Sequence, residues 1–130
     1  MQQVLIVDDE RYIHHVLGKL LKEHFECEVE AVATSEEALA KMADRLPAVL
    51  FVDANMPGTN TLWLVESVRN DEKLKATPII MLSSMSFDEI EDAYKRKGAN
   101  YCFSKMCLVA PEEREQFLGT LAEFLPRKEG

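Results

Sequence analysis

The stretch VLFVDANMPGTN, residues Val49–Asn60, carries both a strand signal and a chemical signal. Four apolar residues lead directly to Asp53, and the helix- and strand-breaking residues Pro57 and Gly58 follow soon after. A short, continuous apolar run is typical of a strand buried on both faces, as in a parallel sheet. We therefore expect Asp53 to lie at the tip of a central strand that the Pro57-Gly58 turn brings to an end.

Strand and helix patterns alternate on both sides of this stretch. The strand-like segments are Gln3–Val7, Glu28–Ala33, Ala48–Val52, Ile79–Leu82 and Asn100–Ser104. The segments with helical spacing of apolar residues are Ile13–Phe25, Thr34–Leu46, Leu62–Asn70, Ser86–Gly98 and Pro111–Leu125. Five such strand–helix units predict an α/β fold, with a parallel sheet and helices on both of its faces.

Several helix ends can be assigned from single residues. Either Thr34 or Ser35 is the expected N-cap of the second helix, and Ser86 is the expected N-cap of the fourth. Gly98 is a good residue to follow the end of the fourth helix. Pro111 suits the first position of the last helix.

The length and composition indicate one compact domain, which we expect to span residues 1–126 of the 130. We expect residues 127–130 to be a frayed tail, in which Glu129 and Gly130 could be a cloning remnant. The formal net charge is −8, and a net-acidic domain disfavours direct binding to nucleic acid. No apolar run approaches the length of a membrane span. We therefore expect a cytoplasmic protein with no membrane partner.

The cysteines Cys27, Cys102 and Cys107 are odd in number and lack CxxC spacing. We expect them to be free, buried or half-buried thiols in a reducing compartment.

Polar side chains follow four of the five expected strands. Asp8 and Asp9 follow the first, Asp53 the third, Ser83 the fourth and Lys105 the fifth. The carboxyl ends of parallel strands share one edge of the sheet, where ligands bind in such folds. Carboxylate oxygens gathered there suit Mg²⁺ or Mn²⁺. A lysine and a hydroxyl beside them favour a phosphoryl group as the ligand, with Asp53 as the nucleophile.

Each of these residues taken alone has a simpler explanation. The acidic run after the first strand could cap the following helix, Ser83 could be a helix cap, and Lys105 could be a solvated surface residue. The combination at one sheet edge is what favours a phosphoryl site.

Four segments, in order along nearly the whole chain, resemble the receiver domain of bacterial two-component response regulators. These are VLIVDDE (Val4–Glu10), VDANMPG (Val52–Gly58), IIMLSS (Ile79–Ser84) and GANYCFSK (Gly98–Lys105). The resemblance implies a flavodoxin-like (βα)5 fold with five parallel strands in the order 2-1-3-4-5.

The resemblance also implies a phosphorelay function. Asp53 would accept a phosphoryl group from a sensor histidine kinase or a histidine phosphotransfer protein. Asp9 would bind Mg²⁺ directly and Asp8 mainly through water, while Asp53 and the backbone carbonyl of Asn55 would complete the metal shell. The domain would be a signalling phosphoprotein that catalyses only its own phosphorylation and dephosphorylation, and not a turnover enzyme.

In the same family, Ser83 and Lys105 would contact the oxygens of the phosphoryl group. The Ser83 loop would then move inward and shift the face formed by the fourth helix, the fifth strand and the fifth helix. A downstream protein or output domain would bind that face.

The chain departs from the family pattern near Lys105. The family has proline after this lysine, whereas Met106 stands here, so we expect a trans bond and a differently shaped loop. Cys102 occupies the position of the family's switch aromatic, so another residue is expected to perform any such switching. The loop after MPG usually holds Asp-Gly in the family but reads TNTLW here, and Asn60, which can adopt the left-handed αL conformation, is expected to preserve the turn. Met85 cannot orient a water molecule, which predicts slow loss of the phosphoryl group.

The sequence argues against two other functions and leaves a third open. A haloacid-dehalogenase-type phosphatase also uses an aspartate nucleophile, but it requires Asp-x-Asp where this chain has Asp53-Ala54-Asn55. Dinucleotide binding requires a glycine-rich turn where this chain has Asp8-Asp9-Glu10. A degenerate receiver, acting without phosphorylation as a docking or dimerisation module, is the main alternative.

Overall fold

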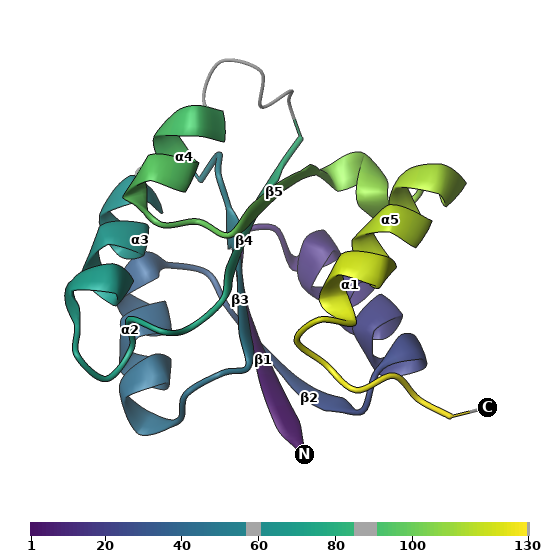
Figure 1. Cartoon of the computed structure of the whole chain (residues 1–130), viewed down its shortest axis with the longest axis horizontal. Helices are drawn as coiled ribbons and strands as arrows, with labels where there is room; N and C mark the ends of the chain where they lie inside the picture. The colour runs from purple at the N-terminus through teal and green to yellow at the C-terminus, as the bar shows by residue number, and fades with distance from the viewer. Residues whose placement is uncertain (57–60, 85–90, 130) are drawn as a thin grey trace.

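The structure is a computed structural model that describes residues 1–56, 61–84 and 91–129. Five parallel strands form one sheet with the neighbour order β2-β1-β3-β4-β5 (Figure 1). The strands are β1 (Gln2–Val7), β2 (Cys27–Val32), β3 (Val49–Asp53), β4 (Ile79–Ser83) and β5 (Tyr101–Ser104). The predicted flavodoxin-like fold and its strand order are therefore confirmed.

The helices lie in two layers, one on each face of the sheet (Figure 1). α2, α3 and α4 cover one face, and α1 and α5 cover the other. The described helices are α1 (Arg11–His24), α2 (Ser35–Asp44), α3 (Thr61–Asn70), α4 (Glu91–Lys97), the 3₁₀ helix η1 (Lys105–Leu108) and α5 (Pro111–Leu121). The two helix layers cover the faces of the sheet, and the polar residues predicted above lie at the carboxyl ends of the strands or directly after them.

Burial of the central strands explains their continuous apolar sequences. Every residue of β3 and β4 is buried, and so are five of the six residues of β1. Their side chains alternate between two hydrophobic clusters, one under α1 and α5 and the other under α2, α3 and α4. A strand that packs on both faces accommodates polar side chains only near its ends, where Gln3 of β1, Asp53 of β3 and Ser83 of β4 lie.

The helix ends largely follow the sequence signals. The Thr34 hydroxyl accepts a hydrogen bond from the Glu37 N–H at 3.1 Å, so Thr34 is the N-cap of α2 and Ser35 is its first helical residue. Gly98 follows α4 with a φ of 121°, which favours glycine. α5 begins at Pro111 as predicted.

Two predictions near the C-terminus were wrong in detail, and one element there was not foreseen. The 3₁₀ helix η1 was not foreseen, and α5 ends at Leu121 and not at Leu125. The tail is not frayed as predicted, because Arg127 forms an antiparallel bridge with Phe25 and the Lys128 N–H donates to the His24 carbonyl at 2.9 Å. Leu125 is itself buried, which draws the chain after α5 back against the domain.

Some predictions concern parts of the chain outside the described residues. These are the Pro57-Gly58 turn, the role of Asn60, the role of Met85 and the cap at Ser86.

Candidate functional site

The strand register brings the predicted site residues to one edge of the sheet. Asp53 is the last residue of β3 and pairs in register with Leu82, so Ser83 lies one step further along β4. Asp8 follows the last residue of β1, and its N–H donates to the Val32 carbonyl at 3.0 Å. Lys105 follows the end of β5 as the first residue of η1.

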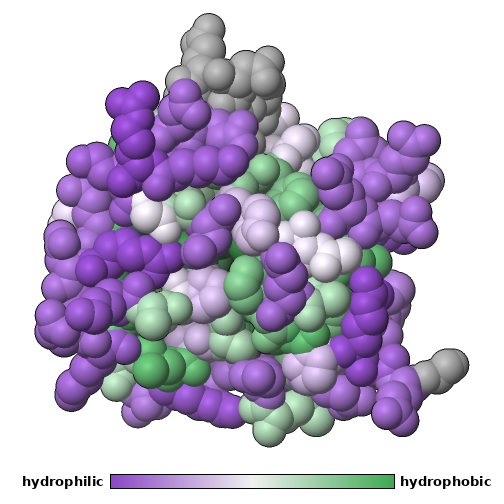
Figure 2. Space-filling model, in the orientation of Figure 1, coloured by the Kyte–Doolittle hydropathy of each residue, from purple (hydrophilic) through white to green (hydrophobic). Residues whose placement is uncertain are grey.

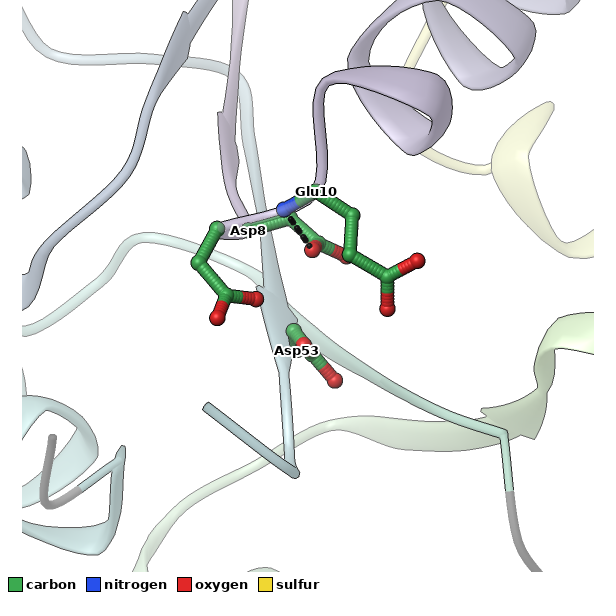
Figure 3. A group of neighbouring side chains, drawn as sticks. Asp8, Glu10 and Asp53 are labelled. Carbon is green, nitrogen blue, oxygen red and sulfur yellow. Dashed lines mark hydrogen bonds between the residues drawn. The ribbon is translucent and has the colours of Figure 1, made fainter. Parts of the chain in front are cut away.

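Four acidic side chains gather at this edge. Asp8, Asp9, Glu10 and Asp53 each offer a carboxylate oxygen within 4.8 Å of the others. Figure 3 shows Asp8, Glu10 and Asp53 grouped where the ends of β1 and β3 meet. Asp8 and Asp53 are almost completely buried, at 1% and 2% exposure, whereas Asp9 and Glu10 are exposed. The site therefore has a buried floor and an open, solvent-facing rim.

Lys105 neutralises part of this charge. Its Nζ lies 3.1 Å from Asp8 Oδ2, 3.5 Å from Asp53 Oδ1 and 3.6 Å from Glu10 Oε1, and its side chain is only 11% exposed. A buried carboxylate needs such a partner, since an unpaired buried charge is costly. The predicted convergence of Lys105 with Asp8 and Asp53 is thus present in the structure.

The two central charges have shifted pKa values. Burial raises the pKa of Asp8, and the nearby Asp53 charge adds to the rise, while the Glu10 N–H and Lys105 oppose it. For Lys105, burial works to lower the pKa, but the charges of Asp53, Asp8 and Glu10 outweigh burial and raise it. Lys105 is therefore a cation at neutral pH. The raised pKa of Asp8 means that its ionised form is less favourable here than in water.

The donor set fits a hard divalent cation. All the ligand atoms are carboxylate oxygens, the type that Mg²⁺ and Mn²⁺ prefer. The raised pKa of Asp8 is compatible with such an ion, because burial and the nearby Asp53 charge raise this pKa and a bound cation would offset both effects. Zinc would more commonly take nitrogen or sulfur ligands.

Asp53 is held in place by its own loop. The Asn55 N–H donates to Asp53 Oδ1 at 3.0 Å, and the Ser83 hydroxyl donates to Asn55 Oδ1 at 2.6 Å. Asn55 thus links Asp53 to Ser83: its backbone N–H bonds the Asp53 carboxylate, and its side-chain oxygen bonds the Ser83 hydroxyl.

Sequence reasoning missed three contributors to this edge. Glu10 was seen next to the aspartates but given no role, although it lies 3.6 Å from Lys105. His14 was not among the predicted site residues, but it is half-buried and its Nε2 hydrogen-bonds the Asp8 carbonyl oxygen. Tyr94 of α4 reaches the Ala54 carbonyl. For His14, its position one turn into the helix that follows Asp8 was an available signal.

The loop around Lys105 differs from a Lys-Pro loop in the expected way. The described residues contain no cis peptide bond, so the Lys105–Met106 bond is trans as predicted. Ser104 is the N-cap of η1, and its hydroxyl accepts a hydrogen bond from the Met106 N–H at 3.2 Å. Proline has no N–H to donate, so Met106 permits a turn that proline would not.

The fold and this site together define a class of protein: a parallel α/β domain with a buried aspartate at a strand tip, facing an acidic pair and a lysine. The chain matches the family model described as the response regulator receiver domain over residues 4–113, and it belongs to that family. The family acts in two-component signalling, in which aspartyl phosphate and magnesium are typical.

Known relatives include both short and long proteins. Protein PilG of Pseudomonas aeruginosa is 34% identical over 124 residues, which cover 95% of this chain and 87% of that protein. A protein-glutamate methylesterase/protein-glutamine glutaminase of Geobacillus kaustophilus is 32% identical over 91 residues, or 69% of this chain, but this chain covers only 25% of that protein.

A solved structure shows the same fold. The Vibrio cholerae chemotaxis protein CheY4 has 34% sequence identity and a TM-score of 0.81, with 96% of this chain and 99% of that chain covered. None of the helices in the described ranges has the length and hydropathy that a membrane span requires.

Proposed function

We infer that Asp53 accepts a phosphoryl group from a phosphohistidine of a sensor histidine kinase or a histidine phosphotransfer protein. One observation carries this proposal: Asp53 is a buried carboxylate at a strand tip, with Lys105 Nζ 3.5 Å from its Oδ1 and three further carboxylates beside it. Membership of the receiver family supports the same reaction.

The chemistry is a simple displacement. An oxygen of Asp53 attacks phosphorus, an O–P bond forms, the N–P bond breaks and its electron pair returns to the imidazole nitrogen. We assign the attack to Oδ2, because Oδ1 is held by the Asn55 N–H. Lys105 lies close enough to the Asp53 carboxylate to stabilise negative charge that develops on the phosphoryl oxygens.

Asp8, Asp9, Asp53 and the backbone carbonyl of Asn55 are the proposed ligands of Mg²⁺, with Mn²⁺ as a substitute. When bound, the metal would neutralise charge on the phosphoryl group and align it with Asp53. The acidic cluster within 4.8 Å supports this assignment.

Phosphorylation is proposed to act on the face formed by α4, β5 and α5, where a downstream protein or output domain would bind. Ser83 is the proposed transmitter, since it is the last residue of β4 and already bonds the Asn55 side chain. A phosphoryl oxygen would compete with Asn55 for the Ser83 hydroxyl and draw it toward Asp53. The proposed location is the cytoplasm, in keeping with the free thiols of Cys27, Cys102 and Cys107.

The decisive experiment measures intact mass after incubation with acetyl phosphate, with and without Mg²⁺. The expected result is a Mg²⁺-dependent gain of one phosphoryl group by the wild type and no gain by Asp53→Asn. A wild type that gains nothing under any condition would favour the degenerate receiver, which docks or dimerises without phosphorylation.

A further inference from the structure

Tyr94 is the buried anchor of α4, and its hydroxyl reaches the loop that follows Asp53. The side chain is 7% exposed and packs in the cluster under α2, α3 and α4. Its hydroxyl lies 3.2 Å from the Ala54 carbonyl oxygen and 3.0 Å from Thr61 Oγ1. Tyr94 therefore touches both the strand tip and the start of α3.

The direction of these hydrogen bonds can be worked out. A carbonyl oxygen only accepts, so the Tyr94 hydroxyl donates its one proton to the Ala54 carbonyl. The Tyr94 oxygen must then accept the proton of the Thr61 hydroxyl. The two bonds form an ordered relay from Thr61 through Tyr94 to Ala54.

The relay continues through a single peptide group to the phosphoacceptor. The Ala54 carbonyl and the Asn55 N–H belong to the same peptide unit, and this N–H donates to Asp53 Oδ1 at 3.0 Å. A donor at the oxygen of a peptide unit polarises it and strengthens the donor at its nitrogen. The other side of the loop is fixed by the Ala54 N–H, which donates to the Leu82 carbonyl at 2.8 Å.

We propose that Tyr94 is a positioning residue for the phosphorylation of Asp53, which it orients through the Ala54–Asn55 peptide group. This inference rests on the proposed function. Holding Oδ1 against the Asn55 N–H leaves Oδ2 directed to the incoming phosphorus. The same contact makes α4 sensitive to phosphorylation of Asp53. A change in the hydrogen bond at Oδ1 would shift the Ala54–Asn55 peptide group, to which the Tyr94 hydroxyl is bonded.

The test is a double-mutant cycle between Tyr94→Phe and Thr61→Val, which remove the two hydroxyls and keep the side-chain shapes. Tyr94→Phe is expected to slow phosphorylation by acetyl phosphate about three- to tenfold, the size that loss of one ordinary hydrogen bond allows. Thr61→Val is expected to slow it less, and to have no further effect in the Tyr94→Phe background, because Thr61 acts through Tyr94. The matched control is Tyr101→Phe, whose hydroxyl bonds Glu123, and its rate is expected to equal that of the wild type.

A second readout needs neither metal nor phosphate. In the metal-free protein, the backbone amide proton resonance of Asn55 is expected to move upfield in Tyr94→Phe and to stay in place in Tyr101→Phe. Urea unfolding of each variant verifies that it is folded.

Three results would overturn the proposal. These are a Tyr94→Phe protein that matches the wild type in rate, an Asn55 resonance that does not move, or additive effects of the two substitutions. A wild type that takes up no phosphoryl group is a different outcome, since it removes the proposed function itself along with the role of Tyr94 in it.

Discussion

Asp8 illustrates, at the scale of a single residue, how a receiver site can be built at the expense of stability. Its carboxyl group is almost completely buried, and its pKa is raised above the ordinary value of 3.8 by burial and by Asp53. A carboxyl group with a raised pKa stabilises the fold only when it is protonated, so its contribution is lost as the pH rises through the folded pKa. At neutral pH and without metal, ionised Asp8 therefore destabilises the fold.

The substitution Asp8→Asn is expected to stabilise the metal-free protein at pH 7 by about 1 kcal/mol, the typical size of a single-residue effect. The gain should shrink as the pH falls from 7 into the acid range and Asp8 of the wild type becomes protonated. Thermal unfolding in EDTA across this pH range measures it, with Glu115→Gln, which removes an exposed carboxylate of α5, as the control.

Addition of Mg²⁺ should reverse the order of stability, because the wild type would gain binding energy that Asp8→Asn lacks. A lower melting temperature for Asp8→Asn in EDTA at pH 7 would mean that the ion pair with Lys105 outweighs the cost of burying Asp8.

At the scale of one helix, the start of α2 carries two neighbouring hydroxyls, of which one caps the helix and the other does not. Thr34 caps the helix by accepting from the Glu37 N–H, and it also donates to the Glu37 carboxylate. Ser35 is fully buried, and its hydroxyl has no hydrogen-bond partner among the described residues. The sequence allowed either residue as the cap, since both types are good N-caps.

Thr34→Ala is therefore expected to cost about 1 kcal/mol of unfolding free energy, as lost N-caps do. Ser35→Ala is expected to be neutral or stabilising, because it removes an unsatisfied buried hydroxyl. Urea unfolding of the two single variants gives the comparison. Equal losses in both would show that Ser35 contributes a bond of its own.

The 3₁₀ helix η1 is the element that sequence patterns could least predict. Its four residues are too few for helical periodicity, and its cap depends on Ser104 meeting the Met106 N–H. Only the trans bond before Met106 could be predicted, because non-proline cis bonds are rare.

Across the whole molecule, the sequence predicted best those features in which a single physical requirement selects a single kind of residue. The apolar runs of β1, β3 and β4 predicted the sheet because both of its faces are covered. The polar residues at the strand ends predicted the site edge, since parallel strands end together. Contacts between distant segments, such as Tyr94 with Ala54 and Ser83 with Asn55, have no local pattern and required the structure.

Arg69 also makes long-range contacts, and its hydrogen bonds join three segments at the amino end of β4. Its guanidinium donates to the Gly98, Lys75 and Thr77 carbonyls and to the Asn100 side chain. Burial lowers its pKa. The end of α3, the loop before β4 and the turn after α4 are thereby locked together.

Gly98→Ala should damage this junction. Gly98 has a φ of 121°, and an added Cβ would lie 2.6 Å from Arg69 Cγ. The expected loss is about 1–3 kcal/mol of global unfolding free energy, because the backbone is strained and Arg69 must shift. The matched change Gly119→Ala in α5, where a Cβ would meet nothing within 4 Å, should stabilise the fold by about 0.5–1 kcal/mol. Urea unfolding distinguishes the two, and a neutral Gly98→Ala would contradict this account of the junction.

The two outer strands of the sheet are poorly suited to pairing with a strand of another chain. β2 carries Glu28 and Glu30, which pair with Arg45 and Lys41 of the α2 region at 3.0 and 3.2 Å. β5, at the opposite side, is only four residues long. Charged or very short outer strands offer a poor template to another chain, which would have to displace ion pairs or align on a few residues. Edge-to-edge pairing of the sheet with that of a second copy is therefore disfavoured at both outer strands.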